Sequence, residues 1–362
     1  MANKIIGRTD TSGAVSLGSI LSNSKRPILL VGKGVDETKE VIFNIAGTKD
    51  AIKHFGEDSP FVEIVKILVR NGVKVISGIN VGTYGDEGDE TYKNITEAYD
   101  AAYEVSMTDK DIMIIILDTT DKDAYVNLPV HLMDAENADI YRYAIVGVPI
   151  GTTMDDVLDL ASDLNCDRMM VPYPNVTNTD DIELDGIFTA AGLAAILNTE
   201  TDDPALPTNN IQIVGYSGVA TRYLEIDIMK LINGGVTAMY PEDAAPAIYR
   251  TVTTSQGTKG EESVWHDATT RFIADHVLAT VLAKLKANYK RTKNIARVLE
   301  AIRSDIIAIL DKKLAQEIIE EYDEAMVTVV KDPEDRYGAL ADFEYKVVSP
   351  LYTITVTQHL KI

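Results

Sequence analysis

Cysteine and tryptophan are rare in the sequence, which contains one cysteine, Cys166, and one tryptophan among 362 residues. A single thiol excludes an intrachain disulfide and a zinc site built from several cysteines. The five histidines lie far apart and show no spacing typical of metal ligands; they are His54, His131, His266, His276 and His359. We therefore expect neither a metal nor another cofactor.

The sequence also has no long apolar run and fewer basic than acidic residues. The longest apolar run, Ile112–Leu117, has the length of a strand, whereas a membrane helix needs about 20 residues. Residues 1–8 lack the apolar core of a signal peptide. Acidic residues outnumber basic ones by 56 to 34, which gives a net charge of −22. We expect synthesis in a cytoplasm, no membrane insertion and no nucleic-acid partner, since this field repels polyanions.

Strand and helix patterns alternate over residues 25–200. Residues 27–31 form an apolar run of strand length, and Ser59-Pro60 is a typical helix start before the amphipathic segment up to Arg70. Further strands are expected at 40–45, 73–77, 111–117, 143–147 and 168–171, and further helices at 48–55, 91–106, 153–164 and 186–197. This alternation predicts an α/β lobe with a doubly wound mixed sheet.

The pattern changes after residues 201–210, which are rich in Asp, Pro, Thr and Asn and are predicted to be a linker. Residues 211–346 are predicted to form a C-terminal α+β lobe, with helical periodicity almost throughout 265–322. The last segment, 347–362, alternates Thr with Ile or Val and predicts a terminal β-arm. Residues 1–24 are predicted to be a second extended arm.

Two segments keep an enzymatic alternative open. Gly32–Gly34 follows a strand as in dinucleotide-binding loops, but Glu37 stands where the third glycine belongs. Asp118–Asp123 follows a central strand, where α/β enzymes bind ligands. A nucleotide- or sugar-binding α/β enzyme with its site at these strand ends is the alternative function, and a soluble oligomeric scaffold is a third possibility.

Other chemical motifs are incomplete. Gly215–Gly218 resembles a nucleophile elbow, but Val219 replaces its closing glycine. The acidic loop 85–90 lacks the ligand order of a calcium loop. Cys166 stands beside Asp167, which disfavours a reactive thiolate. We therefore predict no catalytic, metal-binding or cofactor-binding residue, and no enzyme.

A cationic stripe stands out in this acidic chain. Its six members follow one another without an intervening acid; they are Lys284, Lys286, Lys290, Arg291, Lys293 and Arg297. Such a stripe is either a solvated helix face or a docking surface for an acidic partner.

Three segments, in order along the chain, resemble contractile tail sheath proteins. The first is Thr48–Val75, a short helix, His-Phe-Gly, Asp-Ser-Pro, a helix, Asn-Gly and a strand. The second is Leu224–Ala238, with an acidic short helix, Leu-Ile-Asn, two glycines and a returning strand. The third joins Tyr249–Thr254 to the long helical run and the terminal strand. The chain thus resembles the sheath subunits of phage tails, phage-tail-like bacteriocins and contractile injection systems.

The resemblance implies a structural subunit that polymerises around a tail tube and contracts to drive the tube through a cell envelope. It implies that both terminal arms complete the sheets of neighbouring subunits. In the C-terminal arm, the residues expected to do so are Val347, Tyr352, Ile354 and Val356. We expect the cationic stripe, Lys284–Arg297, to contact the tube, which is an inference from charge.

The same resemblance implies the partners and the location. The expected partners are further copies of the chain, the tube protein, the baseplate and the tail terminator. The expected location is the cytoplasm of a host or producer during assembly, and then a virion tail or another contractile particle. The modest length implies a sheath without large outer decoration domains.

Overall fold

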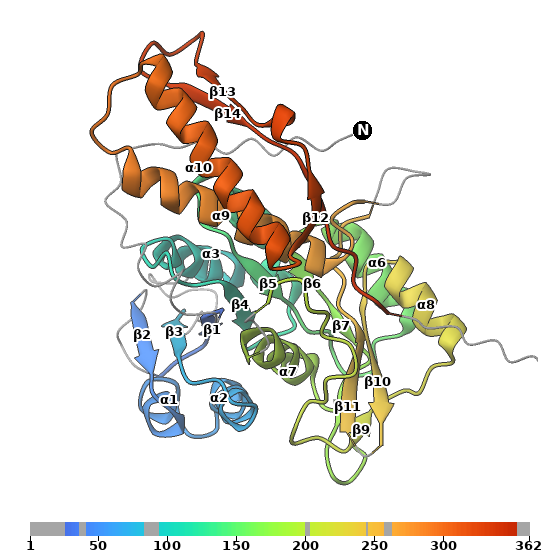
Figure 1. Cartoon of the computed structure of the whole chain (residues 1–362). Coiled ribbons are helices and arrows are strands. Elements are labelled where there is room, and N and C mark those ends of the chain that lie inside the picture. Colours follow the sequence, from blue (N-terminus) through green and yellow to red (C-terminus); the bar gives the residue numbers. More distant parts are fainter. Residues whose placement is uncertain are drawn as a thin grey trace, which may run out of the picture.

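The computed structural model describes residues 26–35, 41–82, 94–199, 203–243, 245–256 and 263–352. Figure 1 shows an α/β body from which two long helices and a β-ribbon project. The helices are α1 (Thr48–Phe55), α2 (Pro60–Arg70), α3 (Ile95–Ser106), α4 (Lys122–Tyr125), α5 (Leu128–Asn137), α6 (Met154–Leu164), α7 (Gly186–Thr199), α8 (Glu225–Asn233), α9 (Ala268–Asn288) and α10 (Ala296–Ala315).

A six-stranded sheet forms the centre of the body. Its order is β2-β3-β1-β4-β5-β6, and all neighbours are parallel except β2, which is antiparallel to β3. Its strands are β1 (Ile28–Gly32), β2 (Ile42–Ile45), β3 (Ile76–Asn80), β4 (Ile114–Leu117), β5 (Tyr143–Ile145) and β6 (Met169–Met170). Parallel neighbours need crossover connections, which the intervening helices supply.

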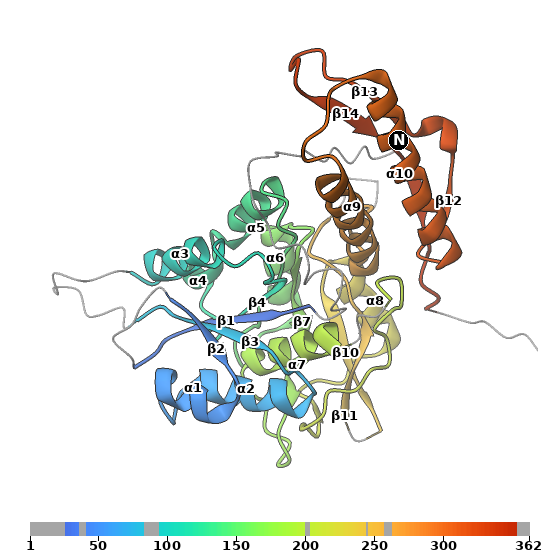
Figure 2. The same cartoon turned by 60° about the vertical axis from the view of Figure 1, so that its left-hand side comes forward.

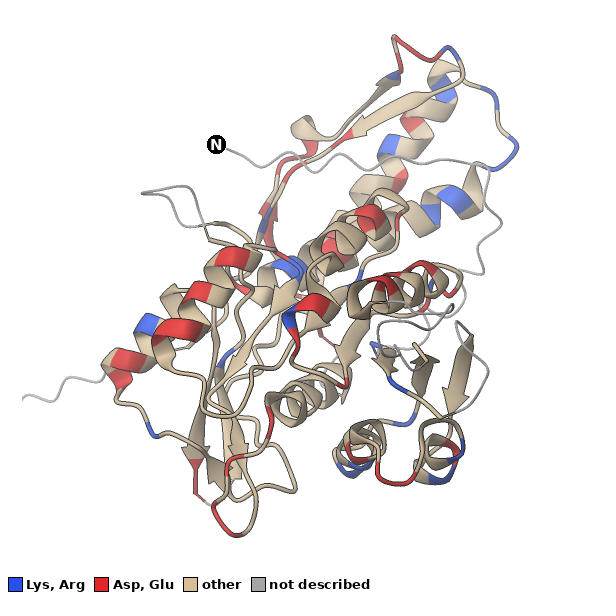
Figure 3. Ribbon diagram, turned by 180° about the vertical axis from the view of Figure 1, so that it is seen from behind, with Lys and Arg blue, Asp and Glu red and all other residues tan. Residues whose placement is uncertain are grey.

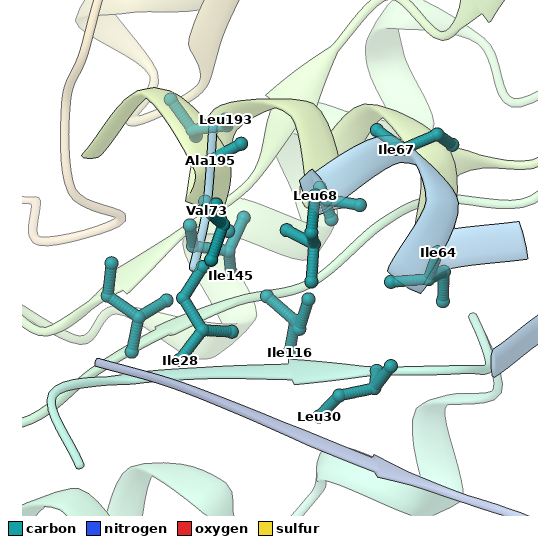
Figure 4. Close-up of a cluster of buried hydrophobic side chains, with 14 of the residues drawn as sticks. Ile28, Leu30, Ile64, Ile67, Leu68, Val73, Ile116, Ile145, Leu193 and Ala195 are labelled. Carbon is teal, nitrogen blue, oxygen red and sulfur yellow. The ribbon is translucent and has the colours of Figure 1, made fainter. Parts of the chain in front are cut away.

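Helices pack on both faces of this sheet. Because side chains alternate along a strand, Ile28 and Leu30 point to one face and Leu29 and Val31 to the other. The first face is covered by α1, α2 and α7, and Figure 4 shows Leu68 of α2 above Ile116 of this sheet. The second is covered by α3, α5 and α6. The predicted mixed α/β class is confirmed.

Local sequence signals place several helix starts. The Ser59 hydroxyl accepts the backbone N–H of Phe61, and Pro60 occupies the first turn of α2. Asn94 and Thr153 each form a capping box with the acidic residue three positions later. The starts of α2 and α6 agree with the predicted helices, because a side-chain acceptor satisfies an otherwise unpaired N–H. Helix α3 begins at Ile95, later than the start predicted at 91.

A smaller sheet lies beside the main one. Its order is β11-β10-β7, and a two-stranded pair, β8-β9, adjoins it. The strands are β7 (Pro172–Tyr173), β8 (Val176–Thr177), β9 (Gly218–Val219), β10 (Thr237–Glu242) and β11 (Ala245–Arg250). Gly235, at φ +82°, lets the chain turn from α8 into β10.

Several sequence-based boundaries were wrong. The strand expected at 73–77 begins at Ile76, because Val73 still caps α2 through a hydrogen bond to Leu68. The helical run expected over 265–322 is two helices followed by β12 (Ile319–Tyr322). Helices α4 and α5 were not predicted, since α5 has weak amphipathic periodicity.

Residues 203–210, within the predicted linker, contact the rest of the chain. The hydroxyls of Thr208 and Thr251 lie 2.6 Å apart, and the Asn210 N–H donates to the carbonyl of Ile248 at 2.7 Å. Thr208 is buried. The division into domains stays a prediction.

Candidate assembly site

Residues 268–347, the last part of the predicted C-terminal lobe, form α9, α10 and a long two-stranded ribbon, and the term lobe is kept below for this part. After β12 come a 3-10 turn (Glu324–Met326), β13 (Thr328–Lys331), β14 (Ala339–Asp342) and β15 (Tyr345–Val347). β13 pairs antiparallel with β14, and β12 with β15, so that the same two segments pair twice. Among the described residues neither outer edge has a partner strand. Such edges are templates for another strand.

The core of this lobe is open along the ribbon. Its buried members come mainly from α9 and α10, including Val277, Ile306 and Leu310. The ribbon buries Ile319 and Val327 against them. Its other side chains that pack there are only partly buried; among them are Val329, Ala341, Phe343, Tyr345 and Val347. On the outer face, Val330 and Leu340 lie directly opposite each other and remain 52% and 45% exposed. An added strand would therefore find both free hydrogen-bonding groups and apolar surface.

The predicted C-terminal arm is described only in part. Val347 pairs with Ile319 inside the ribbon. The Tyr352 hydroxyl donates to Asp267 Oδ2 at 2.7 Å, and the Arg250 guanidinium lies 4.4 Å from its ring centre. Burial, and then Asp267, raises the pKa of Tyr352. These two residues thus contact their own chain.

The other predicted arm residues lie outside the described part of the chain. They are Ile354 and Val356 of the C-terminal arm and the whole N-terminal arm, 1–24. The anchoring of Tyr352 places the start of any free C-terminal arm after this residue. The sequence alone predicts an arm that begins at residue 347.

The cationic stripe spans the end of α9, the connecting turn and the start of α10. Five members are exposed, with no ion-pair partner among the described residues; they are Lys284, Lys290, Arg291, Lys293 and Arg297. Lys286 differs, because its ammonium lies 3.0 Å from Asp139 Oδ2 on the body. Figure 3 shows blue segments gathered at this tip.

The tip also carries acids that the linear sequence did not reveal. Asn294 Nδ2 donates to the carbonyl of Gly338 at 2.8 Å and so holds the α9–α10 turn against the β13–β14 turn. That second turn contains Asp332, Glu334 and Asp335. The stripe is therefore free of acids along the chain, whereas in space it borders an acidic turn.

A buried charge network fixes α9 to the body. Arg168, 1% exposed at the start of β6, donates to both carboxylate oxygens of Asp275 on α9, at 2.7 and 3.0 Å. Arg168 Nη2 also lies 2.9 Å from Oε1 of Glu136 on α5, which pairs with Arg271 of α9 as well. The Tyr143 hydroxyl donates to Asp275. Figure 2 shows α9 running beside α5 where these contacts form.

The pKa shifts in this network follow from burial and pairing. Burial alone lowers the pKa of Arg168, but Asp275 and Glu136 outweigh it, and the pKa rises. Burial would raise the pKa of Glu136, but the two arginines lower it overall. Arg168 and Glu136 therefore stay charged near pH 7. Sequence analysis missed them because Glu136, Arg168 and Asp275 are far apart in the chain.

A second contact joins the two helices of the lobe. The Lys313 ammonium of α10, 6% exposed, donates to Nε2 of His276 on α9. Burial, then Lys313, lowers the pKa of His276 to about 4. His276 is therefore neutral near pH 7 and accepts the hydrogen bond.

At the strand ends considered for an enzyme site, Asp118 is bonded to groups of the protein itself and packs against Gly32. Asp118 accepts the N–H of Lys33 at 2.8 Å and the hydroxyl of Tyr99 at 2.5 Å, and burial raises its pKa. A Cβ at Gly32 would lie 2.6 Å from the Asp118 carboxyl group. The open hollow beside Asp118 includes Asp58, Glu63 and Asp185 among its lining residues, a charge that disfavours phosphate.

The remaining motifs have structural partners. The Ser217 hydroxyl donates to the carbonyl of Asn178. Burial raises the pKa of Cys166 to about 11, which disfavours the thiolate. The acidic loop 85–90 lies outside the described residues. In the described part of the chain, no cluster of three or more His, Cys, Asp or Glu side chains suits a metal ion, and no helix is long and apolar enough to cross a bilayer.

Comparison with known proteins identifies the fold. No family model matches the chain. A cryo-EM structure of the anti-feeding prophage baseplate contains a chain with a TM-score of 0.70 at 14% identity, covering 99% of this chain and 98% of that one. The sheath complex of an extracellular contractile injection system, in its contracted state, gives 0.69 at 12% identity, covering 94% and 93%. The chain has the sheath-protein fold.

A sequence relative agrees with this fold. The tail sheath protein of Bacillus phage SP01 is 23% identical over 255 residues, which are 69% of this chain and 43% of that protein. The chain thus matches less than half of the length of this relative. The resemblance to contractile tail sheath proteins is confirmed, and the enzymatic alternative finds no support in these comparisons.

Proposed function

We propose that the chain is the structural subunit of a contractile sheath, which polymerises around a tube and contracts to drive it through a cell envelope. The observation that carries this proposal is the open ribbon of the C-terminal lobe, in a chain with the sheath-protein fold. A two-stranded ribbon with free edges is marginal by itself and gains stability from further strands.

The terminal arms supply these strands. Residues 353–362 continue the Thr-Ile-Thr-Val alternation after the anchored Tyr352, and residues 1–24 precede the buried Arg26. An arm added to a ribbon edge of a neighbour would place Ile354 and Val356 over the apolar flank and threonines on the other face. The doubly wound body then serves as the rigid part that each arm connects.

The exposed cations of the stripe contact the tube. Five of the six are free to do so, whereas Lys286 is already paired with Asp139. Arginine and lysine on a projecting turn attract a surface rich in carboxylates, mainly by long-range electrostatics. The acidic β13–β14 turn beside them would repel the same carboxylates. We therefore expect the tube surface at this contact to carry basic groups opposite that turn.

The work of such a subunit is mechanical and requires no covalent chemistry. Energy is stored when copies assemble in an extended lattice, and a baseplate signal lets rings rotate and repack. Arms that cross between copies act as hinges and keep the lattice connected. A tail terminator closes the other end, and assembly begins in the cytoplasm of a host or producer cell before the subunit becomes part of a tail or similar particle.

Electron microscopy of the purified protein tests the arm model. The full chain is expected to form hollow cylinders, and a chain ending at Tyr352 is expected to stay monomeric with an unchanged circular dichroism spectrum. The finer test replaces Ile354 and Val356 with serine, with Thr355→Ser as the matched control. Loss of cylinders in the serine variant of Ile354 and Val356, but not in Thr355→Ser, supports the model. Normal cylinders from the truncated chain contradict it.

Co-sedimentation with the tube protein tests the stripe. Reversing two exposed charges, Lys290→Glu and Arg291→Glu, is expected to abolish tube binding at low salt. Lys110→Glu, an exposed lysine of the body, is the matched control. Tube binding that survives the double reversal would assign the tube contact to another surface.

A further inference from the structure

The end of α2 carries an exposed apolar patch with two cations. Val69, Val75 and Val214 are 46%, 56% and 55% exposed. Asn71 joins them by bonding the backbone of Val214 in both directions, at 2.8 and 3.0 Å. Arg70 and Lys74 are exposed between these valines and have no ion-pair partner among the described residues. We call these five residues, Val69, Arg70, Lys74, Val75 and Val214, the α2-end patch.

A second apolar patch lies along α8. Leu224, Ile226 and Met229 are 74%, 67% and 38% exposed, and Ile228, Leu231 and Ile232 of the same helix are buried. The first three side chains thus form the solvent side of α8. Exposed apolar groups that cluster on one helix face are typical of interaction surfaces.

Helix α6 runs beside α8 and adds acids to this patch. A Cβ at Gly234 would lie 2.2 Å from Leu158 Cδ2, and Met154 and Tyr223 line a common hollow. The end of α8 thus lies against the middle of α6, and the residue before Leu224 lies near the start of α6. Four acids on these two helices are exposed; they are Asp155, Asp159, Asp163 and Glu225. We call these acids, with Leu224, Ile226 and Met229, the α6–α8 face.

The acids of α6 repel one another. Asp155, Asp159 and Asp163 are four residues apart, so they form one row on the helix. None has an ion-pair partner among the described residues. Like charges at this spacing destabilise a helix. A cationic surface placed over this row would remove the repulsion.

The two patches lie on different parts of the body. Figure 1 shows α7 and β10 between α2 and α8. Each patch is apolar, and their charges are opposite. Two complementary patches at separate places on one chain can pair between copies, and such a head-to-tail contact generates rings or filaments.

We propose that the α2-end patch of one copy docks on the α6–α8 face of the next copy. This deepens the proposed function, since it names a body-to-body contact of the lattice, and it rests on assembly of copies. Arg70 and Lys74 face the acids of α6, while the valines cover Leu224, Ile226 and Met229. The contact is distinct from the terminal arms and from the cationic stripe.

Charge reversal across the interface tests this proposal. Lys74→Glu and Asp163→Lys are the single changes, because both side chains are exposed and neither makes a described contact. Arg70 is less suitable, because its side chain lies against Gly215. The double variant, Lys74→Glu with Asp163→Lys, restores opposite charges in reversed orientation. Lys49→Glu, an exposed lysine on α1, is the matched control.

The measured quantity is the protein concentration at which cylinders form without tube protein. Each single reversal is expected to raise it about tenfold at low salt, and the double variant is expected to return it towards the wild-type value. The proposed contact would be overturned if the single variants form cylinders at the wild-type concentration. It would also be overturned if the double variant needs as high a concentration as the single variants. Wild-type protein that never assembles would instead overturn the proposed function.

Discussion

The body and the C-terminal lobe differ in how completely each buries its own apolar surface. The main sheet is covered on both faces, and strands β1 and β4 are buried throughout. In the lobe, by contrast, several ribbon side chains that pack on the helices, such as Val329 and Phe343, are only partly buried, although Ile319 is buried, and the ribbon edges lack partner strands among the described residues. In the proposed function, the well-covered body is the rigid part of the subunit, and the lobe gains stability from strands of other copies.

The largest effect is expected at the joint between the two regions. Asp275→Ala removes the carboxylate that pairs with Arg168 and leaves a buried guanidinium without its main partner. Loss of one partner of a buried pair costs about 3–5 kcal/mol. Urea denaturation of the monomer measures this loss. Lys230→Met, which breaks the exposed pair with Asp227, is the control and is expected to cost under about 1 kcal/mol.

Shortening one apolar side chain in each region tests the difference between the buried core of the body and the partly exposed ribbon of the lobe. Leu68→Ala, at a fully buried position of α2, is expected to destabilise the monomer by about 2–5 kcal/mol. Val330→Ser, on the outer face of the ribbon, is expected to change monomer stability by about 0.5 kcal/mol or less. The same Val330→Ser protein is expected to assemble poorly. Equal destabilisation by both changes would argue against an open lobe.

Acid is expected to weaken both regions through one buried histidine each. Burial lowers the pKa of His131 in the body and of His276 in the lobe to about 4, with Arg142 and Lys313 as the second causes. The unfolded chain binds these protons near pH 6.5 and the folded chain does not, so stability falls as the pH drops from about 6.5 to 4. The loss is about 1–3 kcal/mol for each histidine.

Denaturation curves at pH 7 and pH 4.5 measure this loss. His131→Gln and His276→Gln keep an acceptor for Arg142 or Lys313 and should each flatten the pH dependence. A wild-type protein equally stable at both pH values would contradict this account. A flattening by His276→Gln alone would assign acid sensitivity to the lobe.

The smallest effect concerns a single helix start in the body. Ser59→Ala removes the hydroxyl that accepts the Phe61 N–H, and we expect a loss of about 1 kcal/mol. Thermal unfolding followed by circular dichroism measures it, with Ser162→Ala on the exposed side of α6 as the control. A loss no larger than in the control would remove Ser59 as a determinant of α2.

The sequence predicted the body better than the lobe for a physical reason. Ser59, Pro60 and the apolar run of β4 are local signals, and each one determines its element with little help from distant residues. The Arg168–Asp275 pair and the contact of Asn294 with Gly338 depend on residues that only folding brings together. The acidic neighbour of the stripe could not be predicted from charge order along the chain.

The helical run predicted up to Tyr322 shows the same limit. Residues 316–322 continue an amphipathic pattern, but Glu317, with φ of +58°, turns the chain, and β12 then pairs with β15. Pairing with a strand more than twenty residues away outweighed the local preference. The terminal alternation of Thr with Ile and Val, in turn, predicts a strand but not which chain it joins.

A cryo-EM map of assembled protein tests the central claim most directly, which is that other copies complete the ribbon. We expect at least one additional strand beside β13 or β14, with density that traces to the terminal residues of an adjacent copy. A ribbon that stays two-stranded in the assembly, or one covered by the terminus of its own chain, would contradict the account.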